Sequence, residues 1–342
     1  MTDLTSGIDL SALSSKLRQD DRDFRRTFAL GQLADGERRL LPLSDGPADD
    51  GDLRARLVAL IEAKTGIDAS QGGGSGDRLN RLLATLPAAS LPSWVLALDA
   101  EPIESPSWEA LISSLTVQET YFFRDPDQLR FLRREVLAPL IAAQQKERIA
   151  RLSCWCAGCA TGEEAYSLAI LIVEALREAG EADLRPDGSI VIHPRWRISV
   201  LGTDIDPMAL RHARTGCYLD FAMGPFRSLP SAFSGYFEPT TDDARRPGRP
   251  SHRQVHPDIR ALCHFLPFNL AHHEPPVLDA DTVLCRNVLI YLSDRVRSHA
   301  QGLFHRALNQ SGHLALGPTD TVKVPSLFLP LWGPDTVLYR KR

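Results

Sequence analysis

The hydrophobic pattern of the chain changes partway along its length. From Asp52 onward, apolar residues recur at helical spacing in two segments that are separated by the glycine-rich sequence QGGGSG. Beyond Ser107, short apolar runs alternate with helix-length amphipathic segments, which is typical of a mostly parallel sheet covered on both faces. We therefore expect a polar extension over 1–50, a small helical domain over 51–106 and an α/β domain over 107–342.

Individual elements of the α/β domain follow from the same pattern. After the first strand, a helix buries apolar residues at positions i, i+3, i+4, i+7 and i+11, counted from Ala165. Asp206 is expected to cap a second helix, whose first turn tolerates Pro207 because no amide hydrogen is needed there. The expected strands cover 152–156, 198–203, 282–285 and 312–316, with a third helix over 294–308 and a turn over 310–312.

A stretch over about 217–266 is too long for an ordinary connection, and we interpret it as an inserted subdomain. It contains the basic region 245–260, which has five arginines and one acid. A solvated loop is the more common reading of such a run, and an anionic docking surface is the alternative. The triple glycine 72–74 is interpreted as a flexible connection, since no Lys-Ser/Thr pair follows as in a phosphate-binding loop.

Composition narrows the class of protein. The 342 residues are 43% hydrophobic and 24% charged, as in a folded globular chain. The net charge of -4 provides no overall basic field, so we expect no nucleic-acid partner. Without a signal sequence or an apolar run of membrane-spanning length, a cytoplasmic protein without membrane insertion is expected. Its six cysteines are then expected to be reduced.

Polar residues collect just after the strands, where ligands bind in open α/β sheets. After the first strand, Gly158 and Gly162 allow the backbone to approach a ligand. The helix then begins with Glu163 and Glu164. Two carboxylates at a helix start disfavour a phosphate and favour a ligand with positive charge. S-adenosylmethionine has such charge on its ammonium and sulfonium groups.

Three further strand ends support the same ligand. Asp204 ends the second strand, where a carboxylate commonly accepts hydrogen bonds from ribose hydroxyls. Asn269 and Asn287 follow apolar runs and offer amide groups to an adenine or to a methionine part. Each residue alone is weak evidence, because strand-end aspartates are often helix caps. Their joint placement predicts a site for S-adenosylmethionine.

Six sequence blocks occur in a fixed order. They are ETYFFRD (119–125), AGCATGEEAYSLA (157–169), GTDID (202–206), FNL (268–270), CRNVLIYL (285–292) and HLALG (313–317). Together they resemble the chemotaxis-type protein-glutamate O-methyltransferases, the CheR family, over about residues 55–340. The resemblance implies an α/β fold: a doubly wound, Rossmann-like methyltransferase sheet with a small N-terminal helical domain and an inserted small β-subdomain.

The resemblance also implies an activity and a set of site residues. S-adenosylmethionine would be the cofactor, S-adenosylhomocysteine the product, and glutamates in the cytoplasmic region of a methyl-accepting chemoreceptor the acceptors. Arg124 and Tyr291 are the candidate catalytic residues, with side-chain packing as the alternative for Tyr291. Together with the glycine turn, the resemblance gives these cofactor contacts: Gln118, Thr120, Arg124, Gly158, Glu164, Asp204, Asn269, Leu270, Asn287 and Val288.

Two departures from the family pattern stand out. Gln118 occupies a position that is commonly asparagine, and Asp320 a position that is often glutamate. The rings of Tyr121, Phe122 and Phe123 could attract a sulfonium through cation–π contact, or they could pack in the core.

Other interpretations of the sequence concern metal binding and the type of function. Cys154, Cys156 and Cys159 could hold zinc or an iron–sulfur cluster, but no fourth ligand has matching spacing, so we expect no metal. A signalling or scaffold protein that only binds the cofactor, and a methyltransferase with another substrate, are the alternative functions. We expect a monomer.

Overall fold

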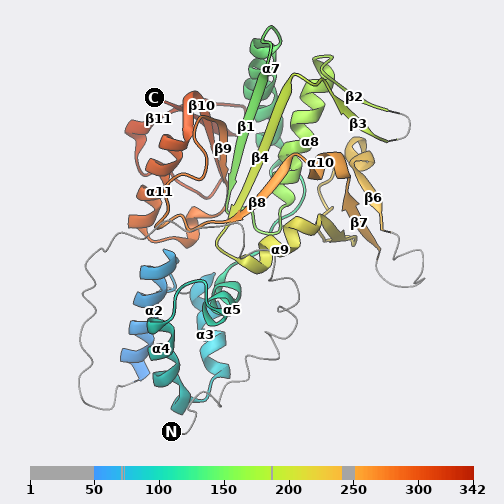
Figure 1. Ribbon diagram of the computed structural model, residues 1–342. Helices are drawn as coiled ribbons and strands as arrows, with labels where there is room; N and C mark the ends of the chain where they lie inside the picture. The colour runs from blue at the N-terminus through green and yellow to red at the C-terminus, as the bar shows by residue number, and fades with distance from the viewer. Residues whose placement is uncertain (1–49, 71, 73, 186–187, 241–250) are drawn as a thin grey trace. The chain divides into compact units, whose positions relative to one another are not determined.

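The computed structural model describes residues 50–342 except 71, 73, 186–187 and 241–250. These residues form two compact units, the first of residues 50–64 and 68–115 and the second of residues 65–67 and 116–342 (Figure 1). The expected N-terminal extension, apart from its last residue, lies outside the described residues. So does the basic run as far as Pro250.

The first unit is helical. Trp108 is fully buried, and its indole Nε1 donates to the carbonyl of Leu98 at 2.9 Å, which joins two of the helices. The expected domain boundary at 106/107 is wrong because the apolar face that contains Trp108 and Leu111 packs within this unit. The boundary follows Leu115. The helices are α2 (Asp50–Thr65), α3 (Ser75–Thr85), η2 (Ala88–Ser90), α4 (Leu91–Ala100) and α5 (Pro106–Leu115).

The second unit is built on a seven-stranded sheet with the order β11-β12-β10-β9-β1-β4-β8. β1 pairs in parallel with β4 and β9, and parallel pairing continues to β8 on one side and β10 on the other. The order reverses at β1, which creates a switch point between β1 and β9. The strands are β1 (Ala150–Ala157), β4 (Trp196–Asp204), β8 (Cys263–Pro267), β9 (Ala280–Cys285), β10 (Leu308–Leu316), β11 (Phe328–Trp332) and β12 (Val337–Lys341).

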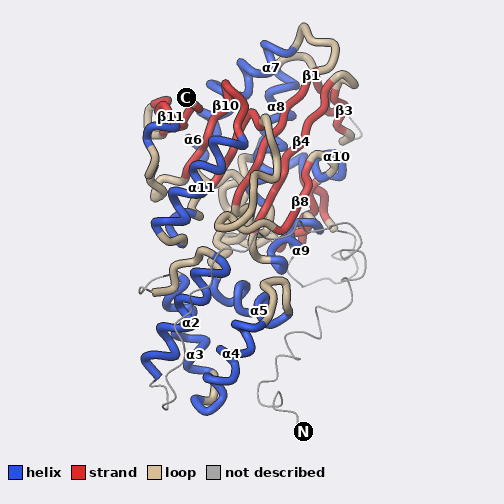
Figure 2. Tube along the Cα trace, turned by 60° about the vertical axis from the view of Figure 1, so that its left-hand side comes forward, coloured by secondary structure: helices blue, strands red, loops and turns tan. Residues whose placement is uncertain are grey.

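Helices cover both faces of this sheet, as the sequence pattern predicts (Figure 2). Cys154 and Cys156 point from β1 into a core that includes Leu168 and Ile172 of the following helix. Trp155, between them, points to the other face and contacts Phe304 with 5.5 Å between ring centroids. The helical segments are α6 (Pro126–Leu132), the π-helical η3 (Arg133–Leu137), α7 (Ala138–Gln144), α8 (Glu163–Glu178), α9 (Pro207–Thr215), α10 (Pro257–Arg260), η6 (Leu289–Tyr291), α11 (Asp294–Ala307) and η7 (Pro325–Leu327).

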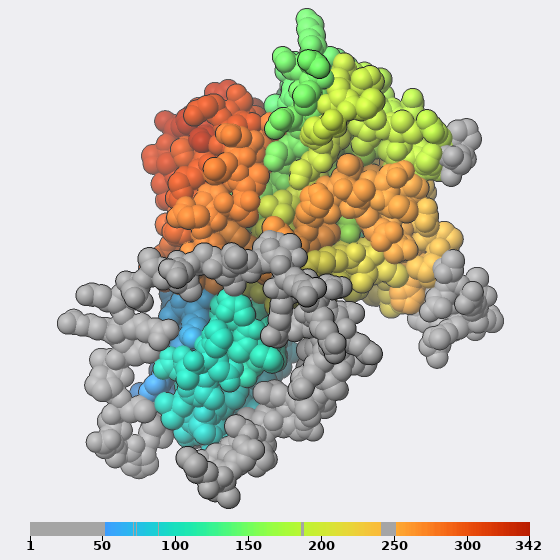
Figure 3. All heavy atoms as spheres, viewed as in Figure 1, coloured from blue at the N-terminus to red at the C-terminus, as the bar shows by residue number. Residues whose placement is uncertain are grey.

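The insert is a small antiparallel sheet with the order β5-β7-β6. It consists of β5 (Cys217–Leu219), η4 (Ser231–Tyr236), β6 (Phe237–Pro239) and β7 (His252–Val255). The expected end at 266 is too late, because β8 is an edge strand of the main sheet and pairs with β4. On the face shown in Figure 3, the described part of the insert lies beside the orange surface of α10 and β8. A separate hairpin is formed by β2 (Ala182–Leu184) and β3 (Ile190–Ile192).

Two local expectations have different outcomes. Asp206 caps α9 as predicted, since its side chain accepts from the amide of Met208 at 2.8 Å. The turn expected over 310–312 is instead an irregularity inside β10, whose register shifts between Leu308 and His313. Within this irregularity, the side chain of Asn309 accepts from the amide of Ser311 at 2.9 Å.

Candidate active site

The glycine turn after β1 contacts the turn after β9, at the switch point of the sheet. Gly158 has a φ of +77°, and a Cβ built on it would lie 2.5 Å from Cγ2 of Val288. The amides of Gly158 and Cys159 both donate to the carbonyl of Thr203, at 2.7 and 2.9 Å. A glycine is therefore required where three adjacent strands end, and two predicted cofactor contacts, Gly158 and Val288, lie against each other.

Asp204 closes this turn from the end of β4. Its Oδ2 accepts from the amide of Ala160 at 2.8 Å, and its Oδ1 accepts from the amide of Asp206 at 2.9 Å. Burial raises the pKa of Asp204 to about 6, and the two amide hydrogen bonds oppose that rise. At neutral pH the carboxylate is mostly ionised and faces the same edge as the glycine turn.

The segment before α6 is tied to the same strand end. The side-chain amide of Gln118 donates to the carboxylate of Asp206, and the hydroxyl of Thr116 donates to it at 3.1 Å. Thr120 is half-buried two residues further along this segment. The side chain of Gln118 is therefore bonded to a helix cap.

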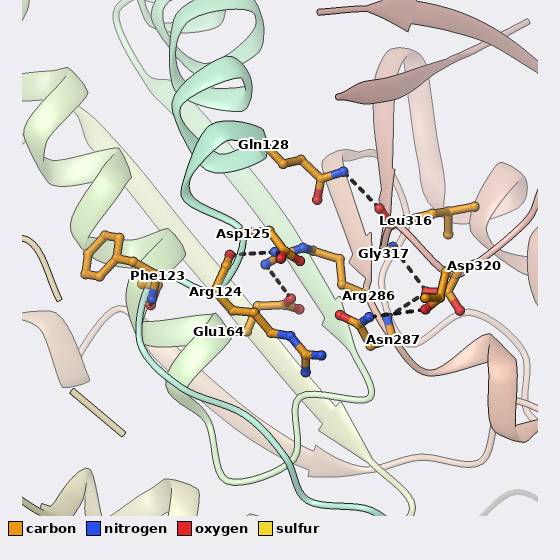
Figure 4. Close-up of polar contacts among 12 residues, drawn as sticks. Phe123, Arg124, Asp125, Gln128, Glu164, Arg286, Asn287, Leu316, Gly317 and Asp320 are labelled. Carbon is orange, nitrogen blue, oxygen red and sulfur yellow. Dashed lines mark hydrogen bonds and ion pairs between the residues drawn. The ribbon is translucent and has the colours of Figure 1, made fainter. Parts of the chain in front are cut away.

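A buried arginine joins the segment before α6 to the start of α8 (Figure 4). The side chain of Arg286, only 2% exposed, contacts Oε2 of Glu164 through Nη1 at 3.1 Å. Its Nη2 contacts Oδ2 of Asp125 at 2.8 Å and donates to the carbonyl of Arg124 at 2.6 Å. Burial raises the pKa of Glu164, and the charge of Arg286 opposes this rise. The arrangement holds Glu164 beside a fixed positive charge.

Arg124 lies close to the same carboxylate. Its charge also lowers the pKa of Glu164, although less than Arg286 does. Nη1 of Arg124 donates to the carbonyl of Glu119 at 2.7 Å, and its guanidinium lies 5.7 Å from the centre of the Tyr121 ring. Arg227 of the insert stacks on that ring at 3.6 Å. The candidate catalytic arginine thus sits on an aromatic side chain that a second arginine also covers.

The neighbouring phenylalanines have a packing role. Phe122 is fully buried and stacks on Phe226 with ring centroids 5.1 Å apart. Phe123 is also buried and contacts Phe233. The core-packing interpretation therefore holds for these two rings, whereas Tyr121 is half-buried.

The turn after β9 has an unusual backbone. Asn287 has a φ of +59°, which is uncommon outside glycine. Its amide donates to Oδ2 of Asp320 at 2.6 Å, and its Nδ2 donates to the hydroxyl of Thr319 at 3.4 Å. Its Oδ1 is buried and has no hydrogen-bond partner among the described residues. Tyr291 lies half-buried in η6, whose first residue follows Val288.

The turn after β8 holds Asn269 and Leu270, both of which are buried. Oδ1 of Asn269 accepts from the amide of Ala271 at 2.9 Å. The amide of Asn269 donates to Nδ1 of His273 at 3.1 Å. The side chain that was predicted to contact a cofactor therefore also shapes its own turn.

Sequence reasoning missed Arg286 and Asp125. Arg286 stands inside the block CRNVLIYL and directly follows a fully buried strand, which is an unusual place for a charged side chain. This position was the feature of the sequence from which Arg286 could have been identified as a site residue. Its acidic partners, Asp125 and Glu164, are far away in the sequence, so no local pattern pairs them with it.

The strand ends have the chemistry that S-adenosylmethionine requires. Glu164 and Asp204 supply negative charge for its cationic groups and for ribose hydroxyls. The side chain of Val288 packs where a Cβ of Gly158 would lie, which brings the two turns together, and the unpartnered Oδ1 of Asn287 is a ready acceptor. The residues present therefore fit this group.

Within the described part of the chain, no three His, Cys, Asp or Glu side chains are grouped in a way that could hold a metal ion. Cys154, Cys156 and Cys159 are buried free thiols whose pKa values are raised by burial. No helix among the described residues is long and apolar enough to cross a membrane.

Comparison with known proteins agrees with the sequence blocks. The family model described as CheR methyltransferase, SAM binding domain matches residues 118–331. The chemotaxis protein methyltransferase 2 of Vibrio cholerae is 32% identical over 64% of this chain and 68% of its own length. The chemotaxis protein methyltransferase 1 of Pseudomonas aeruginosa is 29% identical over 78% of this chain and 88% of its own.

Two further similarities involve a much longer protein and a solved structure. An uncharacterized 104.1 kDa protein of Rhodobacter capsulatus is 31% identical over 72% of this chain, which spans only 23% of that protein. Among solved structures, the magnesium protoporphyrin IX methyltransferase of Synechocystis has a TM-score of 0.33 and 13% identity, covering 87% of this chain and all of that one.

Proposed function

The chain belongs to the CheR methyltransferase family, and we propose that it transfers a methyl group from S-adenosylmethionine to glutamate side chains of a chemoreceptor-type protein. Membership of this family makes the chain an S-adenosylmethionine-dependent methyltransferase. What we propose in addition is the acceptor, a glutamate side chain, and the product, a glutamate methyl ester.

A pair of opposite charges lies at one edge of the sheet, and this pair is the main support for the proposal. Glu164 is a carboxylate suited to a cationic donor, and Arg124 is a guanidinium close enough to shift the pKa of that carboxylate. A guanidinium recognises carboxylates through its planar set of N–H groups. Such a site suits a reaction between a positively charged methyl donor and a negatively charged acceptor.

When bound, S-adenosylmethionine supplies an activated methyl group on a positively charged sulfur. A glutamate carboxylate has a reference pKa of about 4.3, so it is already ionised at neutral pH and needs no strong general base. The residues of the chain therefore contribute position and charge. Arg124 orients the acceptor carboxylate, Tyr291 bounds the acceptor side of the site, and Arg286 fixes Glu164.

The direct test is methyl transfer from labelled S-adenosylmethionine to receptor-containing membranes or receptor cytoplasmic fragments of the source organism. Glutamate methyl esters release volatile methanol in mild alkali. We expect alkali-labile label on a receptor-sized band, with loss of turnover in Arg124→Ala. The matched control is Arg130→Ala. In the parent, the exposed guanidinium of Arg130 pairs with Asp127 on the surface of α6.

Two outcomes would contradict the proposal. Label that survives alkali would mean a nitrogen or other acceptor, and so a methyltransferase with another substrate. Binding of S-adenosylhomocysteine without any transfer of label would favour a cofactor-binding signalling or scaffold protein.

We further propose that the enzyme is cytoplasmic and monomeric, and that it acts on the cytoplasmic region of its receptor.

A further inference from the structure

The turn after β10 carries a carboxylate that gathers backbone amides of the turn after β9. Oδ2 of Asp320 accepts from the amide of Asn287 at 2.6 Å and from that of Gly317 at 3.1 Å. Oδ1 accepts from the amide of Ile290 at 3.2 Å. Asp320 is only 8% exposed, so these bonds replace its solvation by water. Figure 4 shows the carboxylate pointing at both turns.

These bonds bind the two turns together. The amide of Asp320 donates back to the carbonyl of Gly317 at 3.0 Å, which closes its own turn. A Cβ on Gly317 would lie 2.5 Å from the backbone nitrogen of Asn287, so the two backbones are in direct contact. The turn after β10 is therefore a platform for the turn after β9.

The turn after β9 needs such support. A non-glycine residue in the left-handed region is strained, and this conformation persists only where the surroundings impose it. Asn287 has this conformation, and it directly precedes Val288, which lies against Gly158. A change in the backbone at Asn287 would therefore move both side chains that face the switch point.

We propose that Asp320 is a positioning residue that sets the affinity for S-adenosylmethionine by holding Asn287 and Val288 against the glycine turn. This inference rests on the cofactor site proposed above. Asp320 itself is occupied by backbone amides and acts through the turn that it holds.

The negative charge of Asp320 is the part of the side chain that matters. An ionised carboxylate has only acceptor positions, so it can receive several amide hydrogens at once. An asparagine at this position would place an NH2 donor opposite backbone N–H donors. Hydrogen bonds to a charged acceptor are also about twice as strong as neutral ones.

The test uses the full chain and S-adenosylhomocysteine in calorimetric titrations. We expect Asp320→Asn to weaken binding about tenfold or more and Asp320→Glu to stay within about threefold of the parent. The matched control is Asp281→Asn. Asp281, 7% exposed at the other end of β9, accepts from the amide of Ser153 at 2.8 Å. This control should lose stability and keep its affinity within about twofold.

A second readout needs no cofactor. In the free protein, the Asn287 amide proton should resonate far downfield because it bonds to a carboxylate. It should move upfield in Asp320→Asn and return in Asp320→Glu. Where Asp320→Asn gives no folded protein, Asp320→Ser, which can still accept one amide hydrogen, replaces it.

The proposal is overturned if a folded Asp320→Asn or Asp320→Ser variant binds within about twofold of the parent, or if Asp281→Asn loses as much affinity as Asp320→Asn. Failure of the parent itself to bind S-adenosylhomocysteine would overturn the cofactor site and this inference with it. That result is distinguishable, because it appears before any substitution is made.

Discussion

The two ends of the parallel strands in the second unit differ in how their buried polar groups are hydrogen-bonded. At the amino end of β9, Asp281 is bonded by the amide of Ser153 and by the side chain of Asn309, both at 2.8 Å. At the carboxyl end, Asn287 keeps a buried oxygen without a partner among the described residues. Arg286 holds two acids from distant segments in the same region.

The backbone shows the same contrast. Five non-glycine residues in the described part of the chain have positive φ. Asp279 precedes β9 at the amino end, and the other four belong to the turns and segment around the carboxyl edge. These are Phe123, Asp125, Ala160 and Asn287. Strained backbone persists where surrounding contacts impose it, and it clusters at sites that bind ligands. One end of the sheet is therefore built for stability and the other for a ligand.

The largest expected effect concerns the buried ion pair. Arg286→Met should lower the free energy of unfolding by about 4 kcal/mol, because it leaves buried Glu164 without its partner. Arg306→Met is the matched control. Arg306 pairs with Glu274 at 3.3 Å, but both side chains are exposed, so we expect a loss below about 1 kcal/mol. Denaturant unfolding measures both, and equal losses would contradict the contrast between buried and exposed pairs.

Glu163, beside Glu164, gives the next effect. Burial raises the pKa of Glu163 to about 7 from a usual value of 4.5, although the Thr161 hydroxyl donates to it at 2.7 Å. Its contribution to stability is present below pH 4.5 and is lost as the pH rises through 7.

Glu163→Gln should therefore become more stable relative to the parent between pH 4.5 and pH 7, by on the order of 3 kcal/mol at most. Unfolding curves at several pH values measure this difference, with exposed Glu274→Gln as the control. Parallel pH profiles of parent and Glu163→Gln would show that the carboxyl is not perturbed.

The contact between the two turns can be tested with a pair of glycines. Gly158→Ala and Gly180→Ala both place alanine at positive φ, but a Cβ at Gly180 meets nothing within 4 Å. Gly158→Ala should cost about 1–3 kcal/mol more, because the new methyl group collides with Val288. Of the two variants, only Gly158→Ala should weaken S-adenosylhomocysteine binding. The double variant Gly158→Ala/Val288→Ala should recover part of the lost affinity. Identical behaviour of the two variants would refute the contact.

The smallest effect is expected at the end of β4. Asp204→Asn keeps an acceptor for the amide of Ala160, loses the charge and places an NH2 group opposite the amide of Asp206, so we expect about tenfold weaker S-adenosylhomocysteine binding by a variant that still folds. Calorimetry measures the affinity and circular dichroism the fold. Unchanged affinity would remove Asp204 from the cofactor site.

Much of the fold could be predicted because its elements have clear periods. The five apolar positions predicted in α8, from Ala165 to Leu176, are all buried. The strands that end at Asp204 and Cys285 were placed correctly because apolar runs are followed by polar residues. The insert's end was misplaced because β8 is short and follows the polar and aromatic sequence of the insert.

The site was only partly predictable, for a different reason. Positions just after strands follow from the sheet, so Gly158, Asp204 and Asn287 could be proposed from the sequence. Arg286 bonds to Asp125, which lies 161 residues earlier, and no local pattern specifies such a partner. The same holds for Asp320, whose role depends on the amides of another turn.

We propose that the carboxyl edge of the sheet, and not the opposite edge, holds the cofactor. Calorimetric titration of S-adenosylhomocysteine into the parent, Glu164→Gln and Asp281→Asn tests it most directly. We predict binding by the parent, at least tenfold weaker binding by Glu164→Gln because it loses the charge that faces the ligand, and parent-like binding by Asp281→Asn. Parent-like binding by Glu164→Gln, or an equal loss in both variants, would contradict the account.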